Sequence, residues 1–261
     1  MSATRRTDTH SPPAMHEVEL HDVHHAYAGV EVLAGVSLAV APGQVVGLVG
    51  RSGCGKSTLL RLIAGLHEPL SGRIAAAGDE RAGGRLAACA LMPQNDLLMP
   101  WRDALGNAAV ALENAGAGRR GARARARALF AEVGLAGFER SRPHQLSGGM
   151  RQRVAFVRTL LGEKRVLLLD EPFGALDAIT RAEMQDWLRS ELRRRAATAL
   201  LVTHDVEEAL LVCDRVAVLS PRPGRVVLEL DAGFPADAER NALVASAAFV
   251  ERRRAATEAL R

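Results

Sequence analysis

The stretch that decides the fold is residues 45–66, VVGLVGRSGCGKSTLLRLIAGL. It opens with VVGLVG, a short apolar run ending in glycine, which is typical of a buried parallel strand. Its second half carries apolar residues at helical spacing, namely Leu59, Leu62, Ile63 and Leu66. Within residues 50–58, the eight residues from Gly50 to Ser57 match the pattern G-x-x-x-x-G-K-[ST] in the strand-to-helix context that this pattern requires. The sequence therefore predicts a loop that binds the phosphates of a nucleoside triphosphate.

Each residue type in this loop has a physical role in binding phosphate. Glycines let the backbone curl until consecutive N–H groups point at phosphate oxygens, and the positive end of the following helix adds to the attraction. Lys56 supplies a point charge in a chain whose only other lysine is Lys164. Ser57 offers a hydroxyl to Mg²⁺, which prefers hard oxygen ligands. The expected nucleotide-binding residues here are Gly50, Ser52, Gly53, Cys54, Gly55, Lys56, Ser57 and Thr58.

A second chemical signal is VLLLDE at residues 166–171, an apolar strand that ends in two carboxylates. Asp170, at the carboxyl end of a buried strand, is placed to meet the magnesium ion of a phosphate-binding loop. Glu171 can orient and deprotonate an attacking water, a contribution of roughly 10²- to 10⁴-fold. The alternative is an acidic strand end that faces solvent, and the upstream phosphate loop favours the catalytic interpretation.

The rest of the chain alternates strand and helix patterns. Apolar runs VLLLD, ALLVTHD and RVAVLS alternate with helix signals at 178–195 and 205–213, which predicts a parallel sheet covered on both faces. The closing RVAVLSPRPGRVVLEL is typical of a hairpin around a Pro-Gly turn. From about 95 to 160 the pattern is mostly helical. We expect a disordered lead-in at 1–14 and an Ala/Arg-rich terminal helix at 236–261.

Composition excludes several classes of protein. The 261 residues are 48% hydrophobic and 25% charged, which is ordinary for a globular chain of one large or two small domains. No apolar run reaches the roughly 18 residues that span a bilayer, and the start lacks the hydrophobic segment of a signal peptide, so we expect a cytosolic chain. Three scattered cysteines without a CxxC pair indicate neither a disulfide framework nor a cysteine zinc site.

The run LSGGMRQ at 146–152 separates the candidates among phosphate-loop proteins. It resembles the signature of the ATP-binding cassette (ABC) family. Its position in the chain, between the phosphate loop and the acidic strand, also matches the order of motifs in that family. The resemblance covers about residues 16–230. It implies an α/β fold of the P-loop NTPase (RecA-like) type, with a parallel sheet core, an antiparallel β subdomain and an inserted α-helical subdomain at about 95–160. The implied ATPase domain is 15–235, followed by a helical tail at 236–261.

The resemblance also implies a head-to-tail homodimer in the ATP-bound state, with ATP and Mg²⁺ as cofactors. In the family the signature faces the nucleotide held by a second copy, so Ser147, Gly148 and Gly149 are assigned to a shared ATP site. From the residues alone, Ser147 is a natural N-cap, and capping is the alternative role. A helix start with exposed N–H groups can also bind phosphate.

Four further residues match positions that have roles in the family. Tyr27 resembles the aromatic residue that stacks on adenine, and Gln94 resembles the glutamine that meets magnesium and the attacking water. Asp177, in GALD, resembles the aspartate that bridges the dimer, and His204 resembles the switch histidine at the γ-phosphate. The alternatives are a core or surface tyrosine, an exposed loop amide and an ordinary loop histidine. The resemblance thus assigns catalysis to Glu171, His204 and Gln94, and metal binding to Ser57, Gln94 and Asp170.

Three stretches narrow the subgroup. LSGGMRQR, PQNDLLMPWRDALGN and SPRPGRVV resemble importers of nitrate, sulfonate and taurine, and importers of thiamine-precursor pyrimidines look similar. Such a chain docks on two integral-membrane permease subunits at the cytoplasmic face of the membrane, and an extracytoplasmic solute-binding protein acts indirectly. Pro100 and Trp101 follow Gln94, where an apolar ring can pack against a permease helix or within the helical subdomain.

The alternative from another class is a soluble, non-transport ABC ATPase that acts on nucleic acid. Its support is the run GRRGARARARA, whose arginines are Arg119, Arg120, Arg123, Arg125 and Arg127. The run lacks interleaved aromatic residues and the net charge is only +4, so we expect a solvated helical face and no nucleic-acid partner. A metabolic P-loop kinase is a third class, and LSGGMRQR disfavours it.

Overall fold

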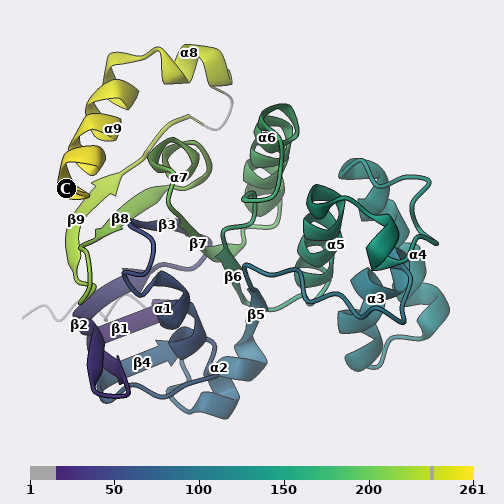
Figure 1. The fold of residues 1–261 in the computed structure, drawn as a ribbon, viewed down its shortest axis with the longest axis horizontal. Helices are drawn as coiled ribbons and strands as arrows, with labels where there is room; N and C mark the ends of the chain where they lie inside the picture. The colour runs from purple at the N-terminus through teal and green to yellow at the C-terminus, as the bar shows by residue number, and fades with distance from the viewer. Residues whose placement is uncertain (1–15, 236–237) are drawn as a thin grey trace, which may run out of the picture.

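The computed structural model describes residues 16–235 and 238–261, so the lead-in predicted at 1–14 lies outside the described part. Within these two ranges, no helix combines the length and apolar character needed to cross a bilayer. The described chain forms two sheets, one group of helices beside them and a C-terminal tail that folds back over the larger sheet (Figure 1).

The larger sheet carries the phosphate loop. Its strands lie in the order β5-β6-β7-β3-β8-β9, and the first five are parallel while β9 is antiparallel to β8. The sheet therefore confirms the predicted parallel core and the closing hairpin. Its strands are β3 (Val45–Gly50), β5 (Cys89–Met92), β6 (Val166–Asp170), β7 (Thr198–Thr203), β8 (Arg215–Leu219) and β9 (Val226–Asp231).

The smaller sheet is antiparallel, with the order β2-β1-β4. Val18 of β1 lies opposite Val40 of β2 and Ala76 of β4, so β1 is the central strand. Alternate side chains of β1 and β2 are buried, as expected for a sheet with one face on the core. Its strands are β1 (Val18–Tyr27), β2 (Val30–Val40) and β4 (Ser71–Ala76).

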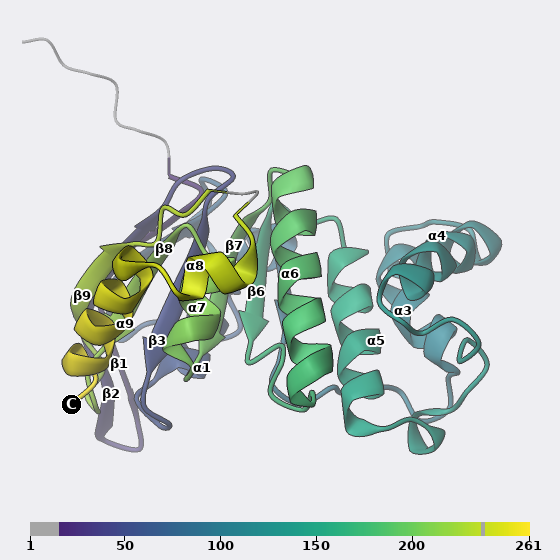
Figure 2. The ribbon, with the colours of Figure 1, turned by 90° about the horizontal axis from the view of Figure 1, so that it is seen from above.

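The central strands feed two separate cores because their side chains alternate between the faces of the sheet. From β3, Val46 and Leu48 enter the core shared with the antiparallel sheet and α1 (Lys56–Ile63). Val45 and Val49 enter the opposite core, which contains α6 (Ala178–Arg194) and α7 (Val206–Val212). Both faces of the parallel sheet are thus covered, and the phosphate loop sits at the sheet's carboxyl edge (Figures 1 and 2).

The helical group extends from the β5 end of the larger sheet (Figure 2). It follows α2 (Ala82–Ala88) and β5, and its helices are α3 (Ala104–Asn114), α4 (Arg119–Glu132), the 3₁₀ turn Pro143–Gln145 and α5 (Gly148–Leu160). The side chain of Asp103 caps α3 by accepting from the Gly106 N–H at 2.7 Å. The predicted helical segment at about 95–160 therefore begins its first helix at Ala104.

The tail is not the single helix that was predicted for 236–261. It contains α8 (Arg240–Val244) and α9 (Ala247–Ala259), and residues 236–237 lie outside the described part. The break occurs because Ser246 is extended and its hydroxyl caps α9 by accepting from the Phe249 N–H at 3.2 Å. Phe249 is fully buried, and its ring lies 5.5 Å from that of Phe234, so α9 is held against the body of the domain.

Candidate nucleotide site

The phosphate loop joins β3 to α1, and its shape depends on glycine. Gly55 precedes α1 with φ +110°, which residues bearing a side chain rarely adopt. A Cβ at this position would lie 2.7 Å from Cδ2 of Leu33 on β2. The loop is therefore pressed against the antiparallel sheet, and residue 55 must lack a side chain.

Lys56 is folded into the loop that it follows. Its residue is 5% exposed, and its Nζ donates to the carbonyl oxygens of Gly50 at 2.7 Å and Arg51 at 3.1 Å. These two bonds compensate the burial of the ammonium group. A phosphate oxygen inside the curl would be a stronger, charged partner for the same ammonium.

A pocket of about 190 Å³ opens in front of this loop. The predicted residues that line it are Tyr27, Ser52, Gly53, Gly55, Lys56, Ser57, Thr58, Gln94 and Glu171. Tyr27 is 41% exposed there, so it is not a core residue. Gly50 and Cys54 were also predicted but do not line the pocket. They pack against each other inside the loop, since a Cβ at Gly50 would lie 2.6 Å from the buried Cys54 sulfur.

Asp170 ends β6 beside the loop, and its surroundings fit a magnesium ion. The residue is buried and its Oδ1 makes no hydrogen bond within the described chain. Burial raises the pKa of Asp170, and a hydrogen bond with Ser57 opposes that change. A hydroxyl and an unsatisfied buried carboxylate oxygen, both hard oxygen donors, form the kind of site that Mg²⁺ binds next to phosphate.

Glu171 is held between two side chains that the sequence analysis also assigned to the site. Its Oε2 accepts from Gln94 Nε2 at 3.1 Å, and its Oε1 lies 3.3 Å from Nδ1 of His204. The residue has φ +48°, a conformation that costs about 1–3 kcal/mol and that concentrates at functional sites. The three side chains come from the β5–α3 connection, the end of β6 and the end of β7, so the fold brings them together from distant parts of the sequence.

Two further residues at the site were missed by the sequence analysis. Gln152 is buried, and it donates to the Glu171 carbonyl at 2.8 Å and accepts from the Ala175 N–H at 2.8 Å. It thereby fixes the backbone of Glu171. Arg222 lines the same pocket as Lys56, and its Nε donates to the Gly53 carbonyl at 3.3 Å. Gln152 stood within the quoted signature, whereas no local pattern pointed to Arg222.

The signature residues and Asp177 do not line this pocket in the same chain. Ser147 caps α5 by accepting from the Met150 N–H at 3.2 Å, so the capping role is real. A Cβ at Gly149 would lie 2.9 Å from Cδ2 of Leu176, which brings the start of α5 close to the segment before α6. Asp177 caps α6 by accepting from the Thr180 N–H at 3.0 Å, and this hydrogen bond lowers the pKa of Asp177.

The connection between Gln94 and α3 carries exposed apolar side chains on a fixed backbone. Trp101 is 73% exposed and Leu97 is 64% exposed, so the interpretation of Trp101 as a core residue of the helical group is wrong. Asn107 is fully buried and anchors this connection. Its side chain accepts from the Met99 N–H at 2.7 Å and donates to the Arg102 carbonyl at 3.2 Å.

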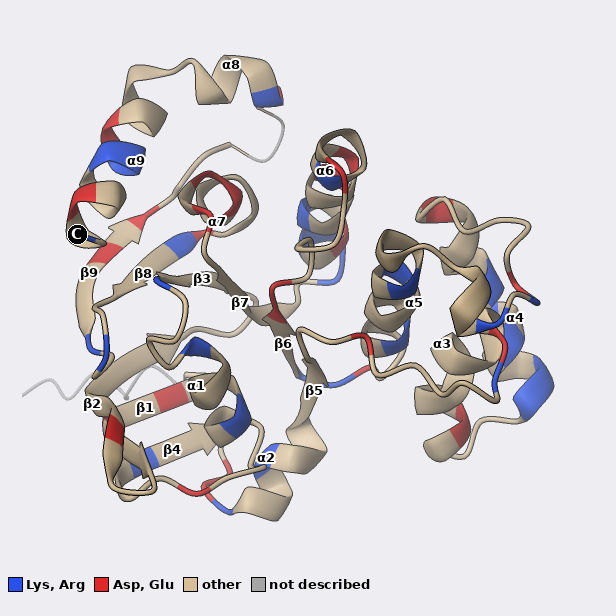
Figure 3. Cartoon of the chain, viewed as in Figure 1, with Lys and Arg blue, Asp and Glu red and all other residues tan. Residues whose placement is uncertain are grey.

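The arginine run lies within α4, where Figure 3 shows several basic segments along the helix. Arg123 pairs with Asp103 at 2.7 Å, Arg125 pairs with Glu163, and Arg119 lies 3.9 Å from Glu113. Much of the positive charge is therefore balanced by this chain's own carboxylates, which agrees with a solvated helical face.

A curled glycine loop with a buried lysine, set beside two carboxylates at a strand end of a parallel sheet, defines a P-loop nucleoside triphosphatase. Residues 33–174 match the family described as ABC transporter, and the chain belongs to this family. It is an ATP-hydrolysing subunit of a transporter.

Curated relatives and solved structures agree with this assignment. The taurine import ATP-binding protein of Pseudomonas fluorescens is 44% identical, with 92% of each chain covered. The aliphatic sulfonates import ATP-binding protein of Rhodococcus jostii is 49% identical over 78% of this chain and 79% of the relative. A dimeric bacterial ABC transporter cassette superimposes with a TM-score of 0.76 at 28% identity, covering 82% of this chain and 98% of the other. The predicted fold class is thereby confirmed, and none of these matches favours the nucleic-acid alternative.

Proposed function

We propose that this chain pairs with a second copy, hydrolyses ATP in two shared sites and thereby drives uptake of taurine or a related alkyl sulfonate through two permease subunits. Its relatives named for taurine and aliphatic sulfonate import cover most of the chain and support this solute class over a thiamine-precursor pyrimidine. A solute-binding protein outside the membrane would deliver the sulfonate to the permeases, and this chain would sit at the cytoplasmic face.

The observation that carries the proposal is the division of the predicted site into two separate parts. Lys56 and Glu171 line one pocket, with Asp170 behind it, whereas Ser147 and Gly149 at the start of α5 do not line that pocket. A second copy, arranged as in a dimeric cassette, would bring its own signature helix to this pocket. The N–H groups at the start of that helix would then complete the binding of the triphosphate.

Within one half-site, each side chain has a distinct task. Lys56 would exchange its two carbonyl partners for β- and γ-phosphate oxygens, and the exposed Tyr27 ring would stack on adenine. Ser57 and Asp170 would hold a magnesium ion, with Gln94 at its edge. When bound, this ion neutralises charge on the phosphates.

Glu171 would accept the proton of the attacking water. Its carboxylate is held by Gln94 from one side and His204 from the other, so both of its oxygens have a fixed direction before substrate arrives. His204 would in turn contact the γ-phosphate, and Asp177 would bridge the two copies. The αL backbone at Glu171, fixed by Gln152, aims the carboxylate into the pocket region.

The exposed connection after Gln94 gives the link to transport. Gln94 contacts Glu171, while Trp101 and Leu97 a few residues later present apolar surface to a partner. A permease helix seated on this surface would feel movements of Gln94 that accompany nucleotide binding and release, because Asn107 keeps the connecting backbone rigid.

Glu171→Gln tests the composite site, because it keeps the shape of the side chain and one acceptor oxygen but removes the base. We expect this variant to form a stable dimer in saturating ATP and magnesium by analytical ultracentrifugation, with hydrolysis reduced roughly 10²- to 10⁴-fold. Glu251→Gln, an exposed carboxylate on α9, is the matched control and should behave as wild type. A Glu171→Gln variant that stays monomeric at saturating ATP would refute the shared site.

The solute is tested by growth of a strain that lacks this gene. We expect failure on taurine or alkyl sulfonates as the sole sulfur source, normal growth on sulfate, and recovery with the wild-type gene but not with Lys56→Ala. Growth defects on nitrate as nitrogen source, or a thiamine-precursor requirement, would replace the sulfonate assignment.

A further inference from the structure

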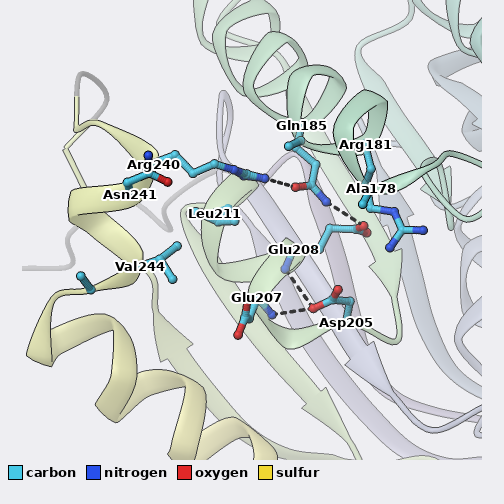
Figure 4. Close-up of a pocket in the computed structure, with 12 residues that line it drawn as sticks. Ala178, Arg181, Gln185, Asp205, Glu207, Glu208, Leu211, Arg240, Asn241 and Val244 are labelled. Atoms are coloured by element: carbon cyan, nitrogen blue, oxygen red, sulfur yellow. Dashed lines mark hydrogen bonds between the residues drawn. The ribbon is translucent and has the colours of Figure 1, made fainter.

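One cavity in the described part of the chain lies apart from the nucleotide pocket. It has a volume of about 450 Å³ and lies where the tail helix α8 faces α6 and α7 (Figure 4). Its wall includes Gln185 of α6, Glu208 of α7 and Arg240 of α8. These three side chains connect the C-terminal tail to the core of the domain.

The connection is a chain of hydrogen bonds through a buried amide (Figure 4). Arg240 donates through Nη2 to Oε1 of Gln185, and Gln185 Nε2 donates to Oε2 of Glu208 at 3.1 Å. Gln185 is 4% exposed and Glu208 is 5% exposed. Because a guanidinium only donates, Arg240 fixes the amide with its oxygen toward the guanidinium and its NH₂ toward Glu208.

Glu208 also reaches the catalytic side of the domain. It lines a second, smaller cavity of about 70 Å³ together with Glu171 and His204. Asp205, which directly follows His204, caps α7 by accepting from the Glu207 and Glu208 N–H groups at 2.9 and 3.3 Å. Any shift of the first turn of α7 therefore moves the residue next to His204.

The tail holds this first turn at two adjacent residues. Arg240 of α8 reaches Glu208 through Gln185, and Arg253 of α9 pairs directly with Glu207. The two contacts come from different tail helices. Helix α9 packs against both α7 and β9, and its Phe249 is buried. The tail thus contacts the first turn of α7, which directly follows the His204 loop.

We propose that Gln185, Glu208 and Arg240 are positioning residues, through which the docked C-terminal tail holds His204 beside Glu171. The inference rests on the proposed role of His204 in hydrolysis. It assigns to the tail a role in ATP turnover. Without the docked tail, Gln185 loses its hydrogen bond from Arg240, and the His204 loop is free to move away from Glu171. None of the three residues lines the nucleotide pocket, so we assign their effect to the position of α7 and the His204 loop.

The test compares Arg240→Ala and Gln185→Leu with wild-type full-length chain in saturating ATP and magnesium. We expect kcat to fall roughly fivefold while KM for ATP stays within twofold, because the nucleotide pocket is intact. Arg240→Lys, which can still donate to Gln185, should recover most of the rate. Arg254→Ala is the matched control, since this exposed α9 arginine lies 3.9 Å from Glu258 and contacts no α6 or α7 carboxylate in the described structure.

The decisive readout is the same substitution in a His204→Ala background, followed with radiolabelled ATP. If Arg240 acts through His204, Arg240→Ala lowers the residual rate no further. A wild-type kcat in Arg240→Ala and Gln185→Leu, or the same fivefold loss with and without His204, overturns the inference. Thermal melts show whether each variant is folded at the assay temperature, and Arg240→Gln replaces Arg240→Ala if the latter is not.

These outcomes also separate this inference from the proposed function. Hydrolysis that survives His204→Ala and Glu171→Gln at the wild-type rate contradicts the proposed function itself. Hydrolysis that requires His204 but ignores Arg240 contradicts only the role of the tail.

Discussion

Glu208→Gln should stabilise the protein relative to wild type, and this gain should be larger at alkaline pH than at acid pH. Glu208 is buried between α6 and α7, and burial raises its pKa from 4.5 to about 7 against the hydrogen bonds from Thr203 and Gln185. Asp205 reinforces this rise, and Arg181 opposes it. The charged form is therefore disfavoured in the folded chain, and glutamine removes the charge while it keeps the shape.

The magnitude follows from the difference between the folded and unfolded pKa values. An acid whose pKa is raised on folding destabilises the protein as pH rises from its unfolded to its folded value. For a change from 4.5 to about 7, the cost is about 1 kcal/mol at pH 5 and about 3 kcal/mol at pH 8. The glutamine amide itself changes the free energy of unfolding by an amount that does not depend on pH. The diagnostic quantity is therefore how much the difference between variant and wild type grows from pH 5 to pH 8, which is about 2–3 kcal/mol.

Urea unfolding of both proteins at pH 5, 6 and 8 measures this change, with circular dichroism and tryptophan fluorescence as parallel probes. We expect the free energy of unfolding of Glu208→Gln, relative to wild type, to rise steadily with pH and to level off above pH 8. Glu251→Gln should show a flat difference, because that residue is exposed. A flat difference for Glu208→Gln as well would refute the claim that Glu208 titrates near neutrality inside the fold.

Two further predictions concern residues at the edges of the site. Arg222→Ala should weaken ATP binding about three- to tenfold in a fluorescence titration, since a guanidinium beside the phosphate loop attracts the triphosphate; Arg225→Ala, exposed on the same hairpin loop, should change it little. Trp101→Ala should reduce copurification with the permease subunits, because an exposed aromatic at an interface centre contributes about 2 kcal/mol or more. Retained ATP affinity in the first variant, or undiminished copurification in the second, would contradict these assignments.

The central sheet and phosphate loop were predictable because their signals are local. VVGLVG and VLLLD are apolar almost throughout, as strands buried on both faces must be, and the glycine and lysine spacing after β3 is specific to phosphate-binding loops. The hairpin β8–β9 was likewise marked by its Pro-Gly turn. These features depend on neighbouring residues and so can be deduced from the order of residues alone.

The segment between α1 and α3 was harder to predict. Strand β5 has four residues, CALM, and follows an Ala/Gly-rich helix without a strong apolar stripe. It is a strand because β6 offers a parallel partner, which is a tertiary effect. The break before α9 was missed for a related reason, since Ser246 interrupts an alanine-rich stretch whose composition favours a continuous helix.

In the candidate site, too, some residues have local sequence signals and others are placed only by tertiary contacts. Lys56 and Glu171 stand in recognisable patterns, and their neighbours Gln94 and His204 were assigned by resemblance to the family. Arg222 lies 169 positions from Gly53 in the sequence, and only the folding of the β8–β9 loop over the phosphate loop brings the two together. Contacts of this kind have no local signature.

The two carbonyl partners of Lys56 have a consequence for the speed of nucleotide exchange. An ammonium group released by a departing nucleotide would have the Gly50 and Arg51 carbonyl oxygens as partners, so it would not be left unpaired in a poorly solvated place. Release of ADP would then carry no cost for an unpaired buried cation, and these two hydrogen bonds would hold the loop in position for the next ATP. An ATPase that exchanges ADP for ATP in every cycle would benefit from a phosphate loop that need not refold between the two nucleotides.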